Sequence, residues 1–557
     1  MVKRLGLTPF DFPLTVFWLS AAAGLAVTYN PSIGVRTLLA ITGMVVLYAY
    51  LSRTATSKQR WDSFALVLVI LGVLAGGYFI SQAGHIAYDD KLGLIDRAAQ
   101  TIASIFPAFP FWKPVANSLA TFLEGILFLT VGLALLAQGN SRRRLAWGMV
   151  AILVVGLVFT ASRGAWLSVL GAGLLWAALH WKPARWLAFA AAVGLIGMVI
   201  FVLIRGDINA LAEIPLVGQL AGALFMRPDR LEVYNHSLAL LAEQPFTGIG
   251  LGNDSFSMIY SRYELALAVP YLVYSHNLLL EIWLQQGLVG AAAFIWLAAA
   301  LYVSLARSPD LKSDLRLQAA AAGLTATLLH GLVDARQYPS LWTWLPFLFL
   351  LGLCAARLIP MQPRGRWRHG WLVPGAFTAA FLILALALTW PLAAAWNANR
   401  AGLLQIRAAF DKTLTLEQQK AMRIQSEDLF QQALAANPGS APIQRRYGLL
   451  LMEEDRYAEA IPHLELAHLA APNHLAARKQ LGLAWLWTGD VARAEKLLAG
   501  ITNIIPELEG LAWQQYQDFH HEQAALNTYL LLDRLNPGQD FYREMIETLQ
   551  NRLKTGN

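Results

Sequence analysis

The chain has 557 residues, of which 56% are hydrophobic and 14% charged, with a net charge of +7 and a mean hydropathy of +0.45. This composition is too apolar for a soluble enzyme and indicates a polytopic membrane protein. The single cysteine, Cys354, excludes an internal disulfide, and the basic residues sort by membrane side instead of forming a nucleic-acid surface.

Apolar runs long enough to cross a hydrocarbon layer, which takes about 20 helical residues, fill the chain up to residue 396. They predict eleven spans, at roughly 13–29, 34–51, 63–83, 116–138, 145–161, 165–181, 186–204, 278–306, 317–334, 338–356 and 371–396. The first run lacks a small-residue cleavage site, so we interpret it as a retained helix and not as a signal peptide. Lysine and arginine gather in every second connection, which predicts a cytoplasmic N-terminus and a C-terminal region outside.

The outer connections carry the unusual polar residues. Residues 84–115 contain FPAFPFWKP, which predicts either an interfacial segment with its rings among headgroups or a re-entrant loop. Arg163 lies in the short third connection, TASRGAW, and Arg230 in the largest one, residues 205–277. A guanidinium can donate two parallel hydrogen bonds to the oxygens of a phosphate. Arginines in the outer connections therefore suit a pyrophosphate ligand. The alternatives are snorkelling to headgroups for Arg163 and a surface salt bridge for Arg230.

The stretch YSHNLLLEIWLQQGLVG, residues 274–290, places a polar triplet directly before an apolar run. We expect Ser275 to cap a helix that begins at Leu278, with His276 near its positive end. That end suits an anion and disfavours imidazolium, so His276 is predicted to be a neutral base, or otherwise an interfacial anchor for the helix. Glu124, inside the fourth span, is a further functional candidate or the partner of a buried hydroxyl.

Four ordered motifs carry a resemblance to a known family. They are TASRGAW at 160–166, RLEVYNHSLALLAEQPFTGIGLGN at 230–253, the stretch at 274–290, and LLHGLVDARQYPSLW at 328–342. Together they resemble the O-antigen ligases, O-antigen polymerases and protein O-oligosaccharyltransferases of bacterial envelopes. The resemblance implies a GT-C-like membrane fold in the inner membrane that moves a glycan from undecaprenyl diphosphate to an acceptor hydroxyl, with inversion and without a metal ion or other cofactor.

The resemblance also implies roles for individual residues. Arg163 and Arg230 would hold the diphosphate, and His276 would be the catalytic general base. The supporting candidates are Asn277, Glu281, His330, Asp334, Gly248 and Gly250. Of these, Asp334 or Glu281 is expected to orient the imidazole, and the glycines let the backbone approach a ligand or another chain segment closely.

A different pattern begins after the last span. Gly448 and Gly482, Ala460 and Ala494, and Pro472 and Pro506 are pairs with one common spacing. That spacing equals the tetratricopeptide period of about 34 residues. Residues 418–440 are interpreted as a preceding degenerate unit and residues 507–554 as capping helices. Such an array exposes a surface for a protein partner, or it serves as a structural cap on the membrane region.

The sequence therefore predicts an all-α protein with two domains. Residues 1–396 form a transmembrane glycosyltransferase domain with about eleven helices, and residues 397–557 form a soluble periplasmic tetratricopeptide-repeat domain. The favoured function is an O-antigen ligase-like transfer to an acceptor such as lipid A-core. A polysaccharide polymerase and a protein O-oligosaccharyltransferase are the alternatives with the same chemistry, and a membrane transporter or scaffold is the alternative without catalysis.

Overall fold

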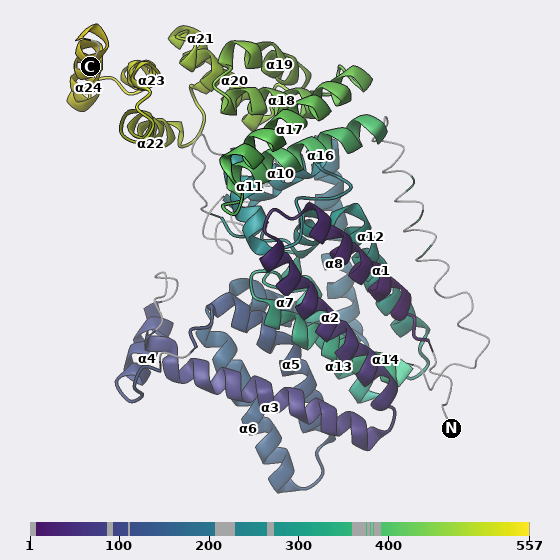
Figure 1. Ribbon diagram of the computed structural model, residues 1–557. Helices are drawn as coiled ribbons and strands as arrows, with labels where there is room; N and C mark the ends of the chain where they lie inside the picture. The colour runs from purple at the N-terminus through teal and green to yellow at the C-terminus, as the bar shows by residue number, and fades with distance from the viewer. Residues whose placement is uncertain are drawn as a thin grey trace.

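The computed structural model describes residues 7–85, 93–109, 112–205, 229–264, 272–358 and 392–555, together with the single residues 375, 379 and 383. All regular elements in these ranges are helices, as the sequence predicts. Figure 1 shows two groups of helices, a bundle formed mainly by α1 to α8 and α12 to α14, and an array formed by α16 to α24 at one end of that bundle.

The bundle and its loop helices follow the apolar runs of the sequence. Its elements are α1 (Asp11–Gly24), η1 (Leu25–Val27), α2 (Pro31–Thr54), α3 (Lys58–Gln82), η2 (Ala83–His85), α4 (Gly93–Ala103), α5 (Ala116–Leu136), α6 (Asn140–Phe159), α7 (Arg163–Ala178), α8 (Lys182–Arg205), α10 (Asp229–Glu243), α11 (Asn253–Glu264), α12 (Leu278–Arg307), α13 (Leu315–Gly331), η4 (Leu341–Thr343) and α14 (Trp344–Leu358). Helices coincide with the first ten predicted spans. The eleventh, 371–396, lies mostly outside the described residues.

Five helical segments among the described residues are long and apolar enough to cross a membrane. They are Pro31–Thr54, Lys58–His85, Ala116–Leu136, Leu278–Arg307 and Leu341–Leu358. The protein is thus a membrane protein, and the total of about eleven spans stays a prediction. Within the predicted connection 84–115, the described residues include the end of η2 and the helix α4, of which only Ala99 is buried, and residues 104–109 and 112–115 are outside any helix.

One long helix of the bundle is broken. Gly287 of α12 has φ 69° and ψ −173°, which lies outside helical geometry and in the left-handed half of backbone space that favours glycine. The backbone of residues 245–249 fills the break, because Leu288 N donates to Pro245 O at 3.1 Å and Ile249 N donates to Leu284 O at 2.6 Å. A Cβ at Gly287 would collide with Phe246 O.

The array consists of paired helices. They are α16 (Leu392–Phe410), α17 (Leu416–Ala436), α18 (Ala441–Glu453), α19 (Tyr457–Ala470), α20 (Leu475–Trp487), α21 (Val491–Leu498), α22 (Ile504–Gln517), α23 (Glu522–Leu535) and α24 (Asp540–Thr555). The packing repeats with the predicted period: a Cβ at Gly448 would lie 2.7 Å from Leu464 Cγ, and one at Gly482 would lie 2.6 Å from Leu498 Cγ. The same close helix contact therefore occurs twice, one repeat period apart.

The predicted preceding unit, residues 418–440, covers most of α17, and the helix that pairs with α17 is α16, which lies before those bounds. Phe430 of α17 is fully buried, and Ala394, Ala398 and Ala401 of α16 belong to the same hydrophobic core as the later repeats. The domain boundary expected between residues 396 and 397 thus falls inside α16. The core of the array includes α16 from Ala394 onward, so the first turns of this helix already pack with the repeats.

Candidate active site

The turn before α12 holds His276 in an unusual backbone conformation. His276 has φ 57°, in the left-handed region that non-glycine residues seldom occupy. The expected capping arrangement is wrong: Asn277, not Ser275, caps α12, with its side-chain oxygen accepting from Leu279 N at 3.0 Å and Leu280 N at 3.1 Å. Ser275 instead donates from its backbone N and its Oγ to Glu281 Oε2, each at 2.8 Å. Glu281 therefore holds the turn through Ser275, and these bonds do not involve the imidazole of His276.

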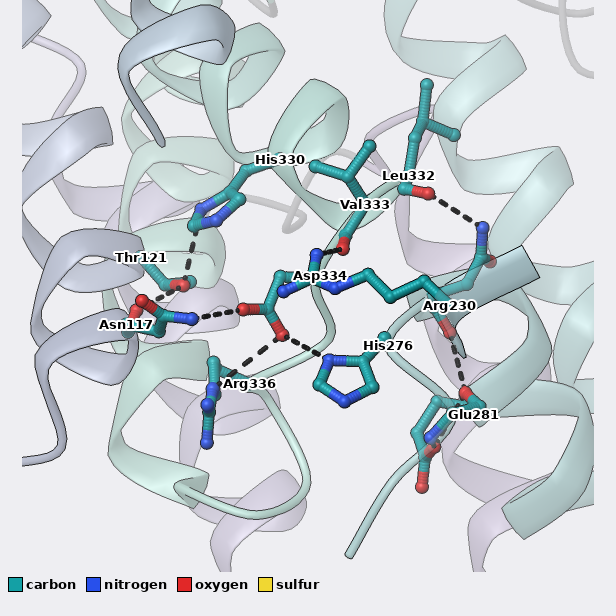
Figure 2. Close-up of polar contacts among 12 residues, drawn as sticks. Asn117, Thr121, Arg230, His276, Glu281, His330, Leu332, Val333, Asp334 and Arg336 are labelled. Atoms are coloured by element: carbon teal, nitrogen blue, oxygen red, sulfur yellow. Dashed lines mark hydrogen bonds and ion pairs between the residues drawn. The ribbon is translucent and has the colours of Figure 1, made fainter. Parts of the chain in front are cut away.

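His276 faces a carboxylate from the opposite loop. Its Nδ1 lies 3.5 Å from Oδ1 of Asp334, a buried residue that follows α13. Figure 2 shows His276 and Arg336 approaching Asp334 from different sides, while Asn117 approaches from α5. Asn117 Nδ2 donates to Asp334 Oδ2 at 2.7 Å, and Arg336 Nε lies 3.6 Å from Oδ1. The carboxylate is thus placed by three groups.

These neighbours set the charge states of the pair. Burial lowers the pKa of the His276 ring below its ordinary value, and Arg230 and Arg336 lower it further, against the opposing effect of Asp334. For Asp334, burial alone would raise the pKa, but Arg336 and His276 hold it well below its usual range. The arrangement favours a neutral imidazole beside an ionised carboxylate at neutral pH. Such a pair can accept a proton at the imidazole and stabilise the resulting imidazolium.

Arg230 reaches the same place from α10. Its Nη1 donates to the carbonyl of Val333, the residue before Asp334. One turn further along α10, Tyr234 OH donates to His276 O at 3.0 Å. The first turns of α10 therefore contact both loops that carry the acid–base pair, and they bring a guanidinium within the same cluster.

Arg163 begins α7, directly after the turn in which Ala161 has φ 50°. The next residue, Gly164, lies against the loop that carries Asp334: a Cβ at Gly164 would be 3.1 Å from both His330 Cδ2 and Val333 Cγ2. The start of α7 is thus next to the residue that Arg230 contacts. The structure brings the four motif segments around Arg163, Arg230, His276 and Asp334 together.

Glu124 and His330 form a separate buried pair in the bundle. His330 Nδ1 lies 2.9 Å from Glu124 Oε2, and both side chains are at most 1% exposed. Ser168 Oγ also donates to Glu124 Oε2, at 3.1 Å, so the buried hydroxyl partner that the sequence suggested is present beside the histidine. His330 therefore points its Nδ1 toward Glu124, although its backbone carbonyl accepts from Asp334 N at 2.8 Å.

The glycine-rich turn after α10 approaches the protein's own backbone. Gly248 and Gly250 have φ 62° and 97°. A Cβ at Gly248 would collide with Leu284 O of α12, and a Cβ at Gly250 would lie 2.6 Å from Thr28 Cα. The glycines were expected to allow close approach either to a ligand or to another chain segment. The contacts of Gly248 and Gly250 are with other chain segments, so this turn packs the loop against α12 and the residues that follow η1.

Four residues of the cluster were given no role from the sequence. Arg336 could have been found, because it is an arginine in an outer connection only two residues after Asp334. Asn117, Tyr234 and Tyr274 have no sequence signal of this kind. Tyr274 packs between the charged groups, with its ring centroid 4.2 Å from that of His276 and 4.5 Å from Arg336 Cζ. Among the described residues, His, Cys, Asp and Glu form no group of three or more with the geometry of a metal site.

The helical bundle, the polar cluster in its loops and the helical repeats define a polytopic membrane protein with a candidate active site at the ends of its helices. Residues 148–295 match the family model described as O-antigen ligase, and residues 451–514 match the tetratricopeptide-repeat model. The chain thus contains a region of the O-antigen ligase family, followed by a tetratricopeptide-repeat region. The first match contains Arg163, Arg230 and His276, whereas Asp334 follows it.

Three curated proteins are similar to parts of the chain. An O-antigen ligase of Salmonella typhimurium strain LT2 is 28% identical over 170 residues, which are 28% of this chain and 39% of that protein. A general O-oligosaccharyltransferase of Acinetobacter baylyi strain ADP1 is 23% identical over 395 residues, 66% of this chain and 63% of its own length. A ComP-specific O-oligosaccharyltransferase of the same strain is 25% identical over 256 residues, 44% and 43% of the two chains. The chain thus spans less than two thirds of the length of each of these relatives.

Proposed function

We propose that the protein transfers a glycan from undecaprenyl diphosphate to an acceptor hydroxyl at the periplasmic face of the bacterial inner membrane. The reaction uses no metal ion and inverts the anomeric carbon. In this proposal the N-terminus is cytoplasmic and the repeat array is periplasmic. The observation that carries the proposal is the pairing of His276 with Asp334 at 3.5 Å, directly beside the carbonyl that Arg230 contacts.

The proposed chemistry is one displacement. The acceptor oxygen attacks the anomeric carbon, the bond from that carbon to the diphosphate oxygen breaks, and the diphosphate leaves with the electron pair. The acceptor proton passes to His276. Since Nδ1 faces Asp334, Nε2 is the atom that accepts this proton, and the carboxylate stabilises the imidazolium that forms.

The leaving group needs charge stabilisation more than protonation, because a diphosphate is already a weak base. Arg230 and Arg163 are proposed to supply it, since guanidinium groups bind phosphate oxygens through paired donors. Arg336 is held beside Asp334 and packs on Tyr274, so its role in this proposal is to position the carboxylate.

Lipid A-core is the first candidate acceptor, as for an O-antigen ligase. A hydroxyl on a protein is the second. It is favoured by the extent of the similarities, since the two O-oligosaccharyltransferases align with 66% and 44% of the chain, and the O-antigen ligase aligns with 28%.

The test is a reconstitution. The purified protein in lipid nanodiscs is incubated with a lipid-diphosphate-linked glycan and either lipid A-core or an acceptor protein, and products are identified by mass. We expect transfer to one acceptor by the wild type and loss of turnover in His276→Gln with donor binding retained. Absence of transfer to every hydroxyl acceptor by folded protein, or turnover in His276→Gln equal to that of the wild type, would refute the proposal.

A further inference from the structure

The repeat array holds the far end of the helix that carries Arg230. Helix α10 begins one residue before Arg230 and ends at Glu243, and the distance between these two residues along the helix is about 20 Å. Figure 1 shows α10 between the bundle and the array. Arg445 of α18 contacts both carboxylate oxygens of Glu243 through Nε and Nη2, and Arg445 and Glu243 are 4% and 7% exposed.

The neighbouring arginine holds the same helix end. Arg446 Nη1 donates to the backbone carbonyl of Glu243 at 3.1 Å, and it is itself buried. The last carbonyls of a helix lack partners within the helix and carry partial negative charge, so a guanidinium there caps α10. We call this set, Arg445 and Arg446 on Glu243, the α10 clamp.

Further contacts make the clamp part of a continuous interface. Arg445 lies over the ring of Tyr263 in α11 at 4.9 Å, and Tyr263 OH lies 2.7 Å from His474 Nε2, directly before α20. An apolar core crosses the same boundary, because Leu240 and Leu241 of α10 share a hydrophobic cluster with Ala476 of α20. The first helices of two successive repeats are thus seated on the loop helices.

The repeat provides an internal comparison. Lys479 occupies the position one repeat period after Arg445 and is equally buried, at 3% exposure. Its Nζ contacts both oxygens of Glu507 at 3.0 Å, within the array. Equivalent positions in the two repeats therefore hold a buried basic residue. Lys479 is paired with Glu507 within the array, whereas Arg445 is paired with Glu243 of α10.

We propose that Arg445 is a positioning residue for the diphosphate site, and that the array acts through α10 to hold Arg230 against the loop of Val333 and Asp334. The inference rests on the proposed role of Arg230 in diphosphate binding. Its physical basis is that α10 has two fixed ends. One is the clamp, and the other is formed by Arg230 on Val333 O and Tyr234 on His276 O.

Releasing a buried carboxylate from its arginine leaves an uncompensated charge, so Glu243 would move toward water and take the end of α10 with it. We expect Arg445→Met to raise the KM for the lipid-diphosphate donor roughly 2- to 30-fold, with a smaller change in kcat, as found for residues that couple to a site without touching ligand. In an Arg230→Ala background the same substitution should have no further effect on donor KM, because the group that it positions is absent.

Lys479→Met is the matched control. It removes an ion pair of the array whose basic residue is as buried as Arg445 and whose acidic residue, Glu507, belongs to α22 and not to α10, so it should lower thermal stability and leave donor KM unchanged. Amide hydrogen exchange gives a readout independent of turnover. Residues 230–236, at the far end of α10 from the clamp, should lose protection in Arg445→Met and keep it in Lys479→Met. Arg445→Lys, which keeps the charge but loses the second contact, serves as the milder variant if Arg445→Met does not fold, with an intermediate effect expected.

Equal donor KM and equal α10 exchange in the Arg445 and Lys479 variants would overturn the inference, as would additive effects of Arg445→Met and Arg230→Ala. Failure of the proposed function has a different signature. In that case Arg230→Ala itself would leave donor use unchanged, whatever the Arg445 variants do.

Discussion

Replacing Glu281 with glutamine should reduce turnover although the two side chains have the same shape. Glu281 accepts three hydrogen bonds, from Ser275 N, Ser275 Oγ and Gln285 Nε2, the last at 2.7 Å. The amide of a glutamine at 281 has one oxygen, which can keep both bonds from Ser275. Its nitrogen then faces Gln285 Nε2, so two donors meet in a buried site.

Rotation of the Gln285 amide does not relieve this conflict. Its Oε1 accepts from Gly252 N at 2.9 Å, and a rotated amide would present its nitrogen to that donor. One buried donor therefore stays unsatisfied in either orientation, which costs about 1–3 kcal/mol. The left-handed backbone of His276 itself costs about 1–2 kcal/mol, so the turn can relax once Glu281 is weakened, and the penalty of about 1–3 kcal/mol then acts against the conformation that positions His276. We expect kcat to fall about 5- to 150-fold.

The assay is glycan transfer at saturating donor in nanodiscs, with thermal midpoints measured in the same lipid. Gln286→Leu is the control, because Gln286 is a buried amide of the same helix whose bonds, to Ser20 Oγ at 2.7 Å and to Tyr338 OH, involve no residue of the turn that carries His276. It should lose stability and keep kcat. If Glu281→Gln turns over within twofold of the wild type, or if both variants lose kcat equally, the turn is not what positions His276.

Four further outcomes follow from the site. Because the neutral imidazole accepts the proton and burial lowers the pKa of His276, kcat/KM should be level above neutrality and fall only below the ordinary value of about 6.5. Asp334→Asn removes the charge that opposes this lowering, so the fall should move to lower pH, and an unmoved acid limb would contradict the pairing. Arg230→Lys keeps the charge but loses the paired donors, so donor KM should rise, and it should rise more in Arg230→Ala; equal kinetics for lysine and arginine would leave Arg230 without the proposed role. Activity should survive EDTA, and a loss that a divalent ion restores would refute the metal-free mechanism.

Hydropathy and spacing were enough to place the helices and the repeats. Apolar runs are local properties, so α5 and α14 fall close to their predicted spans, and the common spacing that pairs Gly448 with Gly482 appears as the same contact in both repeats. The motif around His276 was located in the same way. The capping residue of α12 was not predicted correctly, because Ser275 and Asn277 are both good capping residues. The choice between them depends on Glu281, which accepts the hydrogen bond of the Ser275 hydroxyl.

The sequence did not predict the contacts between residues that are far apart in the chain. Asn117 reaches Asp334 across 217 residues, and Arg445 reaches Glu243 across 202. Nothing in the local sequence around Glu124 distinguishes a histidine partner from a hydroxyl partner, and the structure supplies both. Such pairs become visible only once the helices are packed.

The break in α12 also bears on how deep the site stands in the membrane. The whole helix has 30 residues and would be about 45 Å long if it were straight, well beyond a hydrocarbon layer of about 30 Å. The part after Gly287, from Leu288 to Arg307, matches that thickness by itself, since about 20 helical residues cross such a layer. Backbone groups freed at a break are costly in lipid unless protein satisfies them, and here residues 245–249 do so. If the hydrocarbon layer ends at Gly287, the part of α12 before the break can raise His276 by at most about 15 Å, which is enough to pass the headgroup layer and reach a water-borne acceptor.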